Sequence, residues 1–411
     1  MALKNTSYPK HKINILLLEN ISDVAVDELK DEGYVSIRKI SGALDEKDLI
    51  KEIKGVHLLG IRSKTQVTAK VLAKADKLLA VGCFCIGINQ VDLQAATNKG
   101  IAVFNAPYSN TRSVAELVMG LMIMLLRKVS DKNMAAHQGV WQKDARGCYE
   151  LRGKTLGIIG YGNIGSQVSV MAEAMGMEVL CYDVETKLPH GNARQLRTLR
   201  EVLRKSDVVT LHVPSDAGTR NMMDAAAFAH MKKGSYFLNY SRGDVVDIAA
   251  LREALKSGHL AGAAIDVFPE EPEKNGAAFQ TPLQGLPNVI LTPHIGGSTE
   301  EAQYNIGLDV TSKLIRYLER GTSTGSHTVP PLNVPQQAKT HRILHIHQNI
   351  PGVLGEINSR LSAHAINISG QYLKTNDTIG YVVVDVDSQL SGEAQALLKE
   401  VKGTIRARLL Y

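Results

Sequence analysis

Three polar residues in the second half of the chain carry side chains that together could oxidise a secondary alcohol. Arg242, Glu271 and His294 each follow a short apolar segment that we expect to form a strand. An imidazole can accept the hydroxyl proton near neutral pH, a neighbouring carboxylate can hold its other nitrogen and raise its pKa, and a guanidinium can bind a substrate carboxylate through two parallel hydrogen bonds. Each of these residue types is also common on ordinary surfaces, so the catalytic prediction depends on what surrounds them.

A glycine-rich motif supplies the cofactor site that such an oxidation needs. The sequence LGIIGYGNIG at 156–165 places Gly160, Gly162 and Gly165 in a G-x-G-x-x-G pattern directly after an apolar run. The first glycine permits a tight turn, the second lets backbone approach a pyrophosphate, and the third allows close packing of helix on strand. Asp183 follows Gly165 by 18 residues (183 − 165). Its carboxylate could bind the adenosine ribose hydroxyls and would repel a 2′-phosphate, which favours NAD over NADP. The alternative is an ordinary glycine turn with a capping aspartate.

The elements that must position these residues alternate between strands and helices. In the first hundred residues we expect strands at 13–19, 56–61 and 78–82, with helices at 24–32 and 71–75. A second series has strands at 155–159, 178–182, 208–212, 235–239, 262–266 and 289–292. This alternation predicts an α/β fold with parallel sheets, and the second series fits a doubly wound sheet. Because ligands bind beyond the carboxyl ends of parallel strands, the glycine turn and the three polar residues should meet in one crevice.

Helices and a linker account for most of the remaining chain. The segment 113–129 is predicted to be a long buried helix, with Ser113 as N-cap and Glu116 completing a capping box. A helix should run from 301 to about 320, followed by a linker at 321–339 that is rich in Gly, Ser, Thr and Pro. The last segment predicts a small α+β unit, with strands at 343–347 and 380–386 and helices at 352–364 and 392–401.

Composition and charge limit the class of protein. The 411 residues are 44% hydrophobic and 21% charged, with a net charge of +6 and no run of five or six basic residues. These values predict a soluble multidomain protein that does not bind nucleic acid. The apolar stretch 117–126 is too short to cross a membrane and the first 12 residues lack an apolar signal, so we expect a cytoplasmic location. The four cysteines have no C-x-x-C spacing and should be free thiols: Cys83, Cys85, Cys148 and Cys181.

With these residues identified, the chain resembles the D-isomer-specific 2-hydroxyacid dehydrogenases. The resemblance rests on the glycine turn, the Arg–Glu–His set, the sequence PHIGG at 293–297 and the sequence AIDVF at 264–268. It implies a Rossmann-type doubly wound cofactor domain inserted in a flavodoxin-like substrate domain. The implied domains are 1–107 (first part of the substrate domain), 108–296 (NAD-binding), 297–338 (second part of the substrate domain, and linker) and 339–411 (a C-terminal α+β regulatory domain).

The same resemblance assigns NAD contacts to the positions that match the family's cofactor site. These are Gly160, Gly162, Asn163, Ile164, Gly165, Asp183, Ser241, Arg242, Asp266, His294, Gly296 and Gly297. Tyr240 departs from the family, which usually has a small residue before the Ser-Arg-Gly sequence, and this departure puts substrate tolerance in question.

Within the family, the chain is more similar to the bacterial branch that oxidises 3-phosphoglycerate. The matching sequences are GIRSKT (60–65), GCFCIGINQVD (82–92), NAPYSNTRSVAE (105–116) and GTIRARLLY (403–411). The resemblance implies that Arg62, Ser63 and Lys64 line the pocket of an anionic substrate. A cationic loop after a strand suits a phosphate or carboxylate, and an ordinary solvated turn is the alternative. The implied reaction is NAD-dependent oxidation of 3-phospho-D-glycerate to 3-phosphohydroxypyruvate, the first step of serine biosynthesis, with feedback inhibition by L-serine.

The C-terminal segment 341–411 resembles an ACT domain, a βαββαβ module that binds amino acids, and NIPGVL at 349–354 matches its loop-to-helix turn. By resemblance, His347 and Asn349 of one subunit and Asn367 of the next would bind serine. A shared site implies a homo-oligomer, which in this family is often a tetramer with contacts through the cofactor and ACT domains. Two alternatives remain: a metal site formed by His341, His345 and His347, which we do not favour because no carboxylate or cysteine flanks them, and a module that serves only dimerisation.

Two other functions remain compatible with the sequence. The same catalytic set serves reductases of other 2-oxoacids, such as 2-oxoglutarate, glyoxylate and hydroxypyruvate. Transcriptional corepressors of this fold keep the set but act by binding partners, and they tend to carry a long disordered tail that this chain lacks. The loop 62–64 and the ACT segment favour the regulated enzyme with a phosphorylated substrate.

Overall fold

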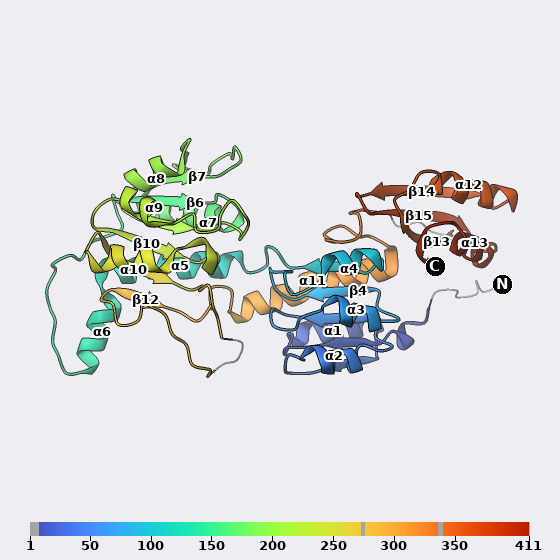
Figure 1. The fold of residues 1–411 in the computed structure, drawn as a ribbon, viewed down its shortest axis with the longest axis horizontal. Coiled ribbons are helices and arrows are strands. Elements are labelled where there is room, and N and C mark those ends of the chain that lie inside the picture. Colours follow the sequence, from blue (N-terminus) through green and yellow to red (C-terminus); the bar gives the residue numbers. More distant parts are fainter. Residues whose placement is uncertain (1–7, 273–275, 336–339, 411) are drawn as a thin grey trace. The chain divides into compact units, whose positions relative to one another are not determined.

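The computed structural model describes residues 8–272, 276–335 and 340–410. The chain divides into two compact units, unit 1 (Met1–Ser109 with Gln303–Tyr411) and unit 2 (Asn110–Ala302) (Figure 1). In the part that the structure describes, no helix has the length and apolar character of a membrane span.

Unit 1 contains a five-stranded parallel sheet in the order β2-β1-β3-β4-β5. This is the strand order of flavodoxin-like folds. Helices α1 and α11 pack on one face of the sheet and helices α2, α3 and α4 on the other. The bounds are β1 Ile15–Leu17, α1 Asp23–Asp31, β2 Ile37–Lys39, α2 Glu46–Glu52, β3 Leu58–Ile61, α3 Ala69–Lys74, β4 Ala80–Cys83, α4 Leu93–Asn98, β5 Ala102–Asn105 and α11 Glu300–Arg320.

Several elements of unit 1 were not predicted from the sequence, among them β2, α2, α4 and β5. Strand β2 has three residues and lies at the edge of the sheet, so none of its side chains is buried. Helix α2 has seven residues and buries only Leu49. Elements that bury so little leave no hydrophobic periodicity in the sequence, and this explains why they were missed.

Unit 2 contains a seven-stranded parallel sheet in the order β12-β11-β10-β9-β6-β7-β8. The order reverses between β6 and β9, as in Rossmann folds, so the predicted doubly wound class is confirmed. The bounds are α5 Thr111–Arg127, α6 Val129–His137, β6 Thr155–Ile159, α7 Asn163–Ala174, β7 Glu178–Tyr182, β8 Arg194–Gln195, α8 Leu199–Lys205, β9 Val208–Leu211, α9 Ala225–His230, β10 Ser235–Asn239, α10 Ile248–Lys256, β11 Leu260–Ile265 and β12 Val289–Leu291.

Helix α5 begins two residues earlier than predicted, and the predicted capping box is wrong. Asn110 occupies the N-cap position. Ser113 lies inside the first turn, where its Oγ is 2.8 Å from Oγ1 of Thr299. Glu116 forms an ion pair with Arg112 one turn earlier. A serine three residues before a glutamate is therefore not sufficient to mark a helix start when the tertiary structure offers other partners.

The C-terminal module of unit 1 has the order β13-α12-β14-β15-α13-β16 and an antiparallel sheet arranged β14-β15-β13-β16. Both helices cover one face, where they pack on apolar side chains of the central strands. The other face contributes Leu344, Ile346 and Tyr381 to the same core as α1 and α11. The bounds are β13 Thr340–Gln348, α12 Val353–Ala363, β14 Ile368–Thr375, β15 Ile379–Asp387, α13 Ser391–Lys399 and β16 Thr404–Leu410.

The segment predicted as a linker contains no helix or strand from 321 to 335, but it is held by buried hydrogen bonds. Oγ1 of Thr328 donates to the carbonyl of Ile101 at 2.7 Å and accepts from the N–H of Val103 at 3.0 Å. The hydroxyl of Tyr381 donates to the carbonyl of Gly321 at 2.6 Å. The small and polar residues that suggest a linker thus also allow close packing at a sheet edge. Residues 336–339 lie outside the described part.

Candidate active site

The glycine motif forms a turn between β6 and α7. Each of its three positions requires glycine for a different geometric reason. Gly160 has a φ of +90°, and a Cβ at this position would lie 2.4 Å from the carbonyl oxygen of His212. A Cβ on Gly165 would lie 2.2 Å from the carbonyl oxygen of Gly160. A Cβ on Gly162 would meet nothing within 4 Å, and no side chain caps the N-terminus of α7 at this residue. Open space beside uncapped N–H groups is the environment that a dinucleotide pyrophosphate requires.

Asp183 lies directly after β7, next to the glycine turn. Its Oδ2 accepts a hydrogen bond from the N–H of Tyr161 at 2.8 Å and its Oδ1 accepts one from the N–H of Glu185 at 3.0 Å. Nζ of Lys187 is 3.9 Å from Oδ1. The carboxylate therefore joins the turn after β6 to the end of β7, and each oxygen keeps further acceptor capacity for ribose hydroxyls. The residues present fit a dinucleotide at this edge.

The three predicted catalytic residues follow β10, β11 and β12 at the carboxyl edge of the same sheet. Nδ1 of His294 lies 2.7 Å from Oε2 of Glu271. Oε1 of Glu271 accepts a hydrogen bond from the N–H of Phe268 at 3.0 Å, which fixes the carboxylate within its own loop. Arg242 stands at the N-cap of the short 3-10 helix Gly243–Val245, and its Nη1 donates to the carbonyl of Ser241 at 2.7 Å. His294 and Glu271 are therefore in direct contact, and Arg242 acts on them through its charge.

The electrostatics of this pair favour a protonated imidazole. The hydrogen bond and the charge of Glu271 raise the pKa of His294 above its ordinary value, although burial opposes the shift. Burial works to raise the pKa of Glu271, but the hydrogen bonds from His294 and from the N–H of Phe268 outweigh it and lower that pKa. The His294 side chain is 51% exposed. Nε2 of this ring is thus the nitrogen available to exchange a proton with a substrate.

The backbone around His294 has a strained conformation that a buried carboxylate holds. His294 has a φ of +53°, in the left-handed region that residues other than glycine rarely adopt. Asp266 is 2% exposed and accepts hydrogen bonds from the N–H groups of Ile295 and Gly296, both at 2.8 Å, and from the hydroxyl of Thr292 at 2.6 Å. Asp266 was predicted as an NAD contact, and the structure gives its carboxylate a direct role in shaping the His294 loop.

Tyr240 extends this network to strand β10. Its hydroxyl lies 3.1 Å from Oγ1 of Thr292, and burial raises its pKa. A Cβ on Gly296 would lie 3.5 Å from the Tyr240 ring. The large side chain that departs from the family pattern thus fills space behind the His294 loop instead of being exposed in the cofactor crevice.

The other predicted cofactor residues also lie in unit 2. Asn163 and Ile164 form the first turn of α7. Ser241 is buried, and its N–H and hydroxyl both donate to Oδ1 of Asn239. A Cβ on Gly297 would lie 2.2 Å from Nδ2 of Asn110, so the glycine is needed for this approach. The structure thus brings the predicted cofactor residues to the loops around one edge of one sheet.

The predicted substrate loop lies in unit 1, directly after β3. Ser63 and Lys64 are exposed and Arg62 is half-buried. The loop backbone is bound by Glu19, which follows β1 and was regarded in the sequence only as the end of a strand. Gln90 binds the carbonyl of Arg62 at 2.7 Å. The position of Glu19, a charged residue at the end of an apolar run, could have marked it as a site residue. The sequence did not show which loop its carboxylate would bind.

The predicted serine-binding residues occupy opposite ends of the ACT sheet. At one end of the sheet, His347 of β13 pairs with Gly380 of β15, which pairs with Thr375 of β14. At the other end, His341 of β13 pairs with Val386 of β15, which pairs with Ile368 of β14, the residue next to Asn367. Six positions (347 − 341) along a strand correspond to about 20 Å. One chain therefore cannot bring Asn367 to His347 and Asn349.

The ring of His347 has a nitrogen that could accept a hydrogen bond from a ligand. It is 4% exposed, its Nδ1 lies 2.8 Å from the carbonyl of Gln348, and its Nε2 is buried with no partner among the described residues. Burial lowers its pKa, which keeps the ring neutral and able to accept a hydrogen bond. Asn349 is exposed and donates to the carbonyl of Asn376 at 2.8 Å.

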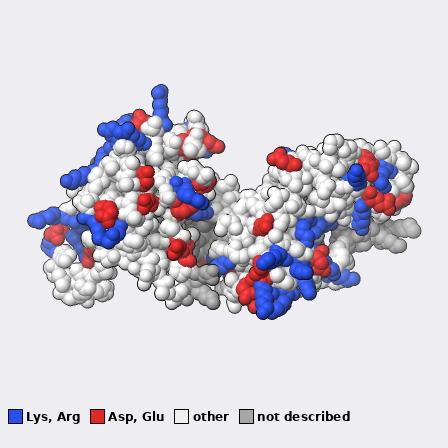
Figure 2. Space-filling model, viewed as in Figure 1, with Lys and Arg blue, Asp and Glu red and all other residues white. Residues whose placement is uncertain are grey.

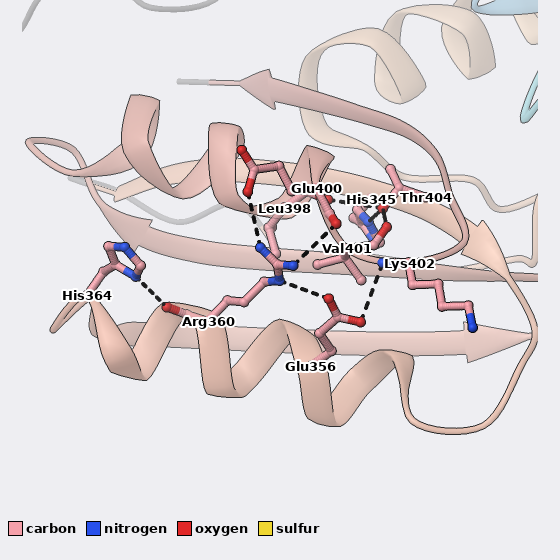
Figure 3. Close-up of polar contacts among 9 residues, drawn as sticks. All are labelled: His345, Glu356, Arg360, His364, Leu398, Glu400, Val401, Lys402 and Thr404. Carbon is pink, nitrogen blue, oxygen red and sulfur yellow. Dashed lines mark hydrogen bonds and ion pairs between the residues drawn. The ribbon is translucent and has the colours of Figure 1, made fainter.

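A polar network on the helical side stabilises the module (Figure 3). Arg360 of α12 pairs with Glu356 one turn earlier at 2.9 Å and with Glu400, just after α13, at 3.2 Å. Nε2 of His345 lies 2.8 Å from Oγ1 of Thr404. The network joins both helices to β13 and β16. In the described part of the chain, no group of three or more His, Cys, Asp or Glu residues is arranged to hold a metal ion.

Charges of both signs are mixed on the surface. On the face drawn in Figure 2, Lys and Arg lie among Asp and Glu and do not form one continuous basic area. None of the four cysteines, all of which the structure describes, forms a disulfide.

Comparison with known proteins agrees with this geometry. Residues 119–296 match the family model described as D-isomer specific 2-hydroxyacid dehydrogenase, NAD binding domain. Residues 343–406 match an AHAS small subunit-like ACT domain.

Relatives of known name cover the whole length. The chain is 52% identical over 405 residues to D-3-phosphoglycerate dehydrogenase of Haemophilus influenzae, covering 98% of this chain and 99% of that protein. It is 51% identical over 411 residues to the enzyme of the same name from Escherichia coli K12, covering both chains fully. The solved structure of D-2-hydroxyisocaproate dehydrogenase superposes with a TM-score of 0.70 at 27% identity, covering 77% of this chain and all of that one. The D-lactate dehydrogenase of Aquifex aeolicus, solved with NAD and lactic acid, gives a TM-score of 0.66 at 27% identity, with the same coverage.

Proposed function

Because this chain belongs to the D-3-phosphoglycerate dehydrogenases, within the NAD-dependent D-isomer specific 2-hydroxyacid dehydrogenase family, we propose that it oxidises 3-phospho-D-glycerate to 3-phosphohydroxypyruvate under inhibition by L-serine. The observation that carries the proposal is the contact between His294 and Glu271 at the sheet edge that also bears the glycine turn. A hydroxyacid bound there would meet an acid–base group and a cofactor site together. The enzyme class and the NAD cofactor agree with the sequence predictions.

Gly162, the first turn of α7 and Asp183 would hold NAD, which would supply the hydride acceptor for the substrate carbon. In the oxidation, Nε2 of His294 takes the hydroxyl proton while Glu271 stabilises the resulting imidazolium through Nδ1. In the reverse direction the same imidazolium donates the proton to the 2-oxo group. The strained φ of His294, held by Asp266, fixes the direction in which the ring points.

Substrate recognition would be divided between two kinds of cationic group. Arg242 would bind the carboxylate next to the reacting carbon, where its planar guanidinium can also polarise the 2-oxygen. Arg62, Ser63 and Lys64 would bind the phosphate, because a doubly charged anion favours several cationic and hydroxyl donors. We therefore assign phosphate recognition to the loop after β3 and the proton transfer to His294 and Glu271.

Serine regulation is assigned to the ACT module. Its antiparallel register separates Asn367 from His347 and Asn349 by the length of the sheet, so a site made from all three needs two chains. We therefore propose a homo-oligomer in which ACT modules pair, with a tetramer as the expected size. The predicted domain boundaries, the cytoplasmic location and the lack of nucleic-acid binding remain predictions.

The test is NADH oxidation with 3-phosphohydroxypyruvate, measured across a titration of L-serine. We expect turnover that falls as serine rises. Turnover that is insensitive to serine would keep the dehydrogenase and assign the ACT module to assembly. Absence of turnover, with activity on 2-oxoglutarate, glyoxylate or hydroxypyruvate, would move the chain to another substrate class of the family.

A further inference from the structure

Glu19 has an unusual position for a charged residue. It is 7% exposed and lies two residues after the end of the buried strand β1. Its φ is +59° and that of Asn20 is +52°, so two successive non-glycine residues adopt the left-handed conformation. Such conformations cost energy and persist where the surroundings require them, often at functional sites.

The Glu19 carboxylate accepts hydrogen bonds from three backbone N–H groups of the loop after β3. Oε1 accepts from Arg62 at 3.1 Å and from Thr65 at 2.8 Å, and Oε2 accepts from Lys64 at 3.0 Å. Both oxygens thus face N–H donors. Only an ionised carboxylate offers acceptors at both positions, because a glutamine would direct its NH₂ at a donor.

The same loop is held from its other side. Nε2 of Gln90, a residue 3% exposed, donates to the carbonyl of Arg62 at 2.7 Å. The backbone of 62–65 is therefore fixed by two buried side chains, while Ser63 and Lys64 are exposed. Residues 62–65 have four backbone N–H groups, and within the described residues only that of Ser63 does not donate to Glu19. This N–H can therefore meet another acceptor.

We propose that Glu19 is a positioning residue for substrate binding, which presets the loop 62–64 for the phosphate of the substrate. This inference rests on the proposed function, in which that loop binds the phosphate. A buried anion satisfied by backbone N–H groups holds the loop backbone, which carries Arg62, Ser63 and Lys64, in one fixed arrangement. A preset site loses less conformational freedom when it binds, so Glu19 acts on affinity for the phosphorylated substrate and not on the hydride step.

The experiment compares Glu19→Gln, Glu19→Asp, Arg62→Ala, Lys64→Ala and the double variant Glu19→Gln/Arg62→Ala in the full-length enzyme. The measured quantities are kcat, KM for 3-phosphohydroxypyruvate, KM for NADH and the Tm. We expect Glu19→Gln to raise KM for 3-phosphohydroxypyruvate about tenfold, with kcat and KM for NADH changed less than about twofold. Glu19→Asp keeps the negative charge on a side chain that is one methylene shorter, and it should raise KM for 3-phosphohydroxypyruvate less.

A matched control separates positioning from general loss of stability. Asp76 is also a carboxylate that accepts a backbone N–H, from Gly55 at 2.8 Å, but it precedes β4 at the opposite end of the same sheet. Asp76→Asn should leave KM for 3-phosphohydroxypyruvate unchanged. If Glu19 acts through the loop, Glu19→Gln should raise this KM less in the Arg62→Ala background than in the wild type.

Each result decides one assignment. If Arg62→Ala raises KM for 3-phosphohydroxypyruvate and Glu19→Gln does not, the loop binds substrate and the role of Glu19 is overturned. If Arg62→Ala and Lys64→Ala both leave that KM unchanged, the loop is not the phosphate site, and the assignment of Glu19 fails together with that part of the proposed function. If Glu19→Gln does not fold, an unchanged KM in Glu19→Asp overturns the proposal in its place.

Discussion

At the residue scale, His294 combines three properties that a reversible acid–base group needs. Its ring contacts a carboxylate, its pKa is raised and its side chain remains half exposed. The raised pKa matters because the same group must release a proton in one direction and take it up in the other. The strained backbone at this residue and the buried Asp266 beneath it hold that geometry.

Replacing His294 by Asn should remove the proton acceptor while the loop remains in place. We expect kcat to fall by about a thousandfold, with NADH still bound. Steady-state kinetics and NADH fluorescence titration measure the two effects. His230→Asn, in α9, is the matched control and should retain normal kcat. Turnover close to normal in His294→Asn would remove this residue from the mechanism.

Replacing Glu271 by Gln should change the pH dependence in a defined direction. Since the hydrogen bond and charge of Glu271 raise the pKa of His294, their loss lowers it. Reduction needs the imidazolium, so the alkaline limb of its kcat/KM profile should move to lower pH. Oxidation needs the neutral ring, so its acidic limb should move the same way. An unshifted profile would show that another group titrates in these limbs.

At the element scale, the turn between β6 and α7 separates glycines required by the fold from the glycine required by the ligand. Gly165 touches the backbone of Gly160, whereas the Cβ position of Gly162 is open. Gly162 and Gly165 occur in one motif, and the sequence alone assigns them different roles only by analogy with other dinucleotide-binding turns. The structure gives the distances that distinguish them.

Gly162→Ala and Gly165→Ala should therefore change different properties, the first cofactor affinity and the second stability. Gly165→Ala should destabilise unit 2 by about 2–3 kcal/mol, because the methyl overlaps a carbonyl oxygen. Gly162→Ala should leave the free energy of unfolding nearly unchanged and raise the Kd for NADH at least about tenfold, because the methyl occupies the approach of the pyrophosphate. Denaturant unfolding and fluorescence titration measure each quantity. The two positions would lose their distinct roles if Gly162→Ala bound NADH normally.

At the scale of the whole molecule, the ACT module packs against the rest of unit 1. One face of its sheet shares a core with α1 and α11, and Tyr381 bonds to Gly321 at the start of the segment that the composition suggested was a linker. A hinge at Gly321 or at Thr328 would have to break a buried hydrogen bond. The ACT module therefore shares a packed core with the rest of unit 1.

The register of the ACT sheet predicts complementation between two defective chains. Asn349→Ala and Asn367→Ala should each abolish serine inhibition in a homo-oligomer. Hybrids refolded from an equal mixture should recover part of the inhibition, because one shared site of the pair then keeps both asparagines. Serine titration of the separated hybrid measures the recovery. Inhibition that stays absent in the hybrid would indicate that each chain binds serine by itself.

The amino-acid sequence by itself determined the local features of this protein. The six predicted strands of unit 2, the glycine turn and the polar residues after β10, β11 and β12 could be predicted because each depends on short-range patterns of apolar residues and glycines. The edge strand β2, the short helix α2, the true N-cap of α5 and the packing of 321–335 could not, because little of their sequence is periodic and their partners are distant in the chain.

Only the tertiary structure decided which polar groups meet across long sequence separations. Glu19 and Arg62 are 43 residues apart, and His294 and Glu271 are 23 apart. The first contact was not foreseen, whereas the second was expected from the common carboxyl edge of parallel strands. A sheet brings strand ends together whatever the length of the connections between them. The sequence therefore shows which edge holds the chemistry, and the folded backbone determines which side chains touch.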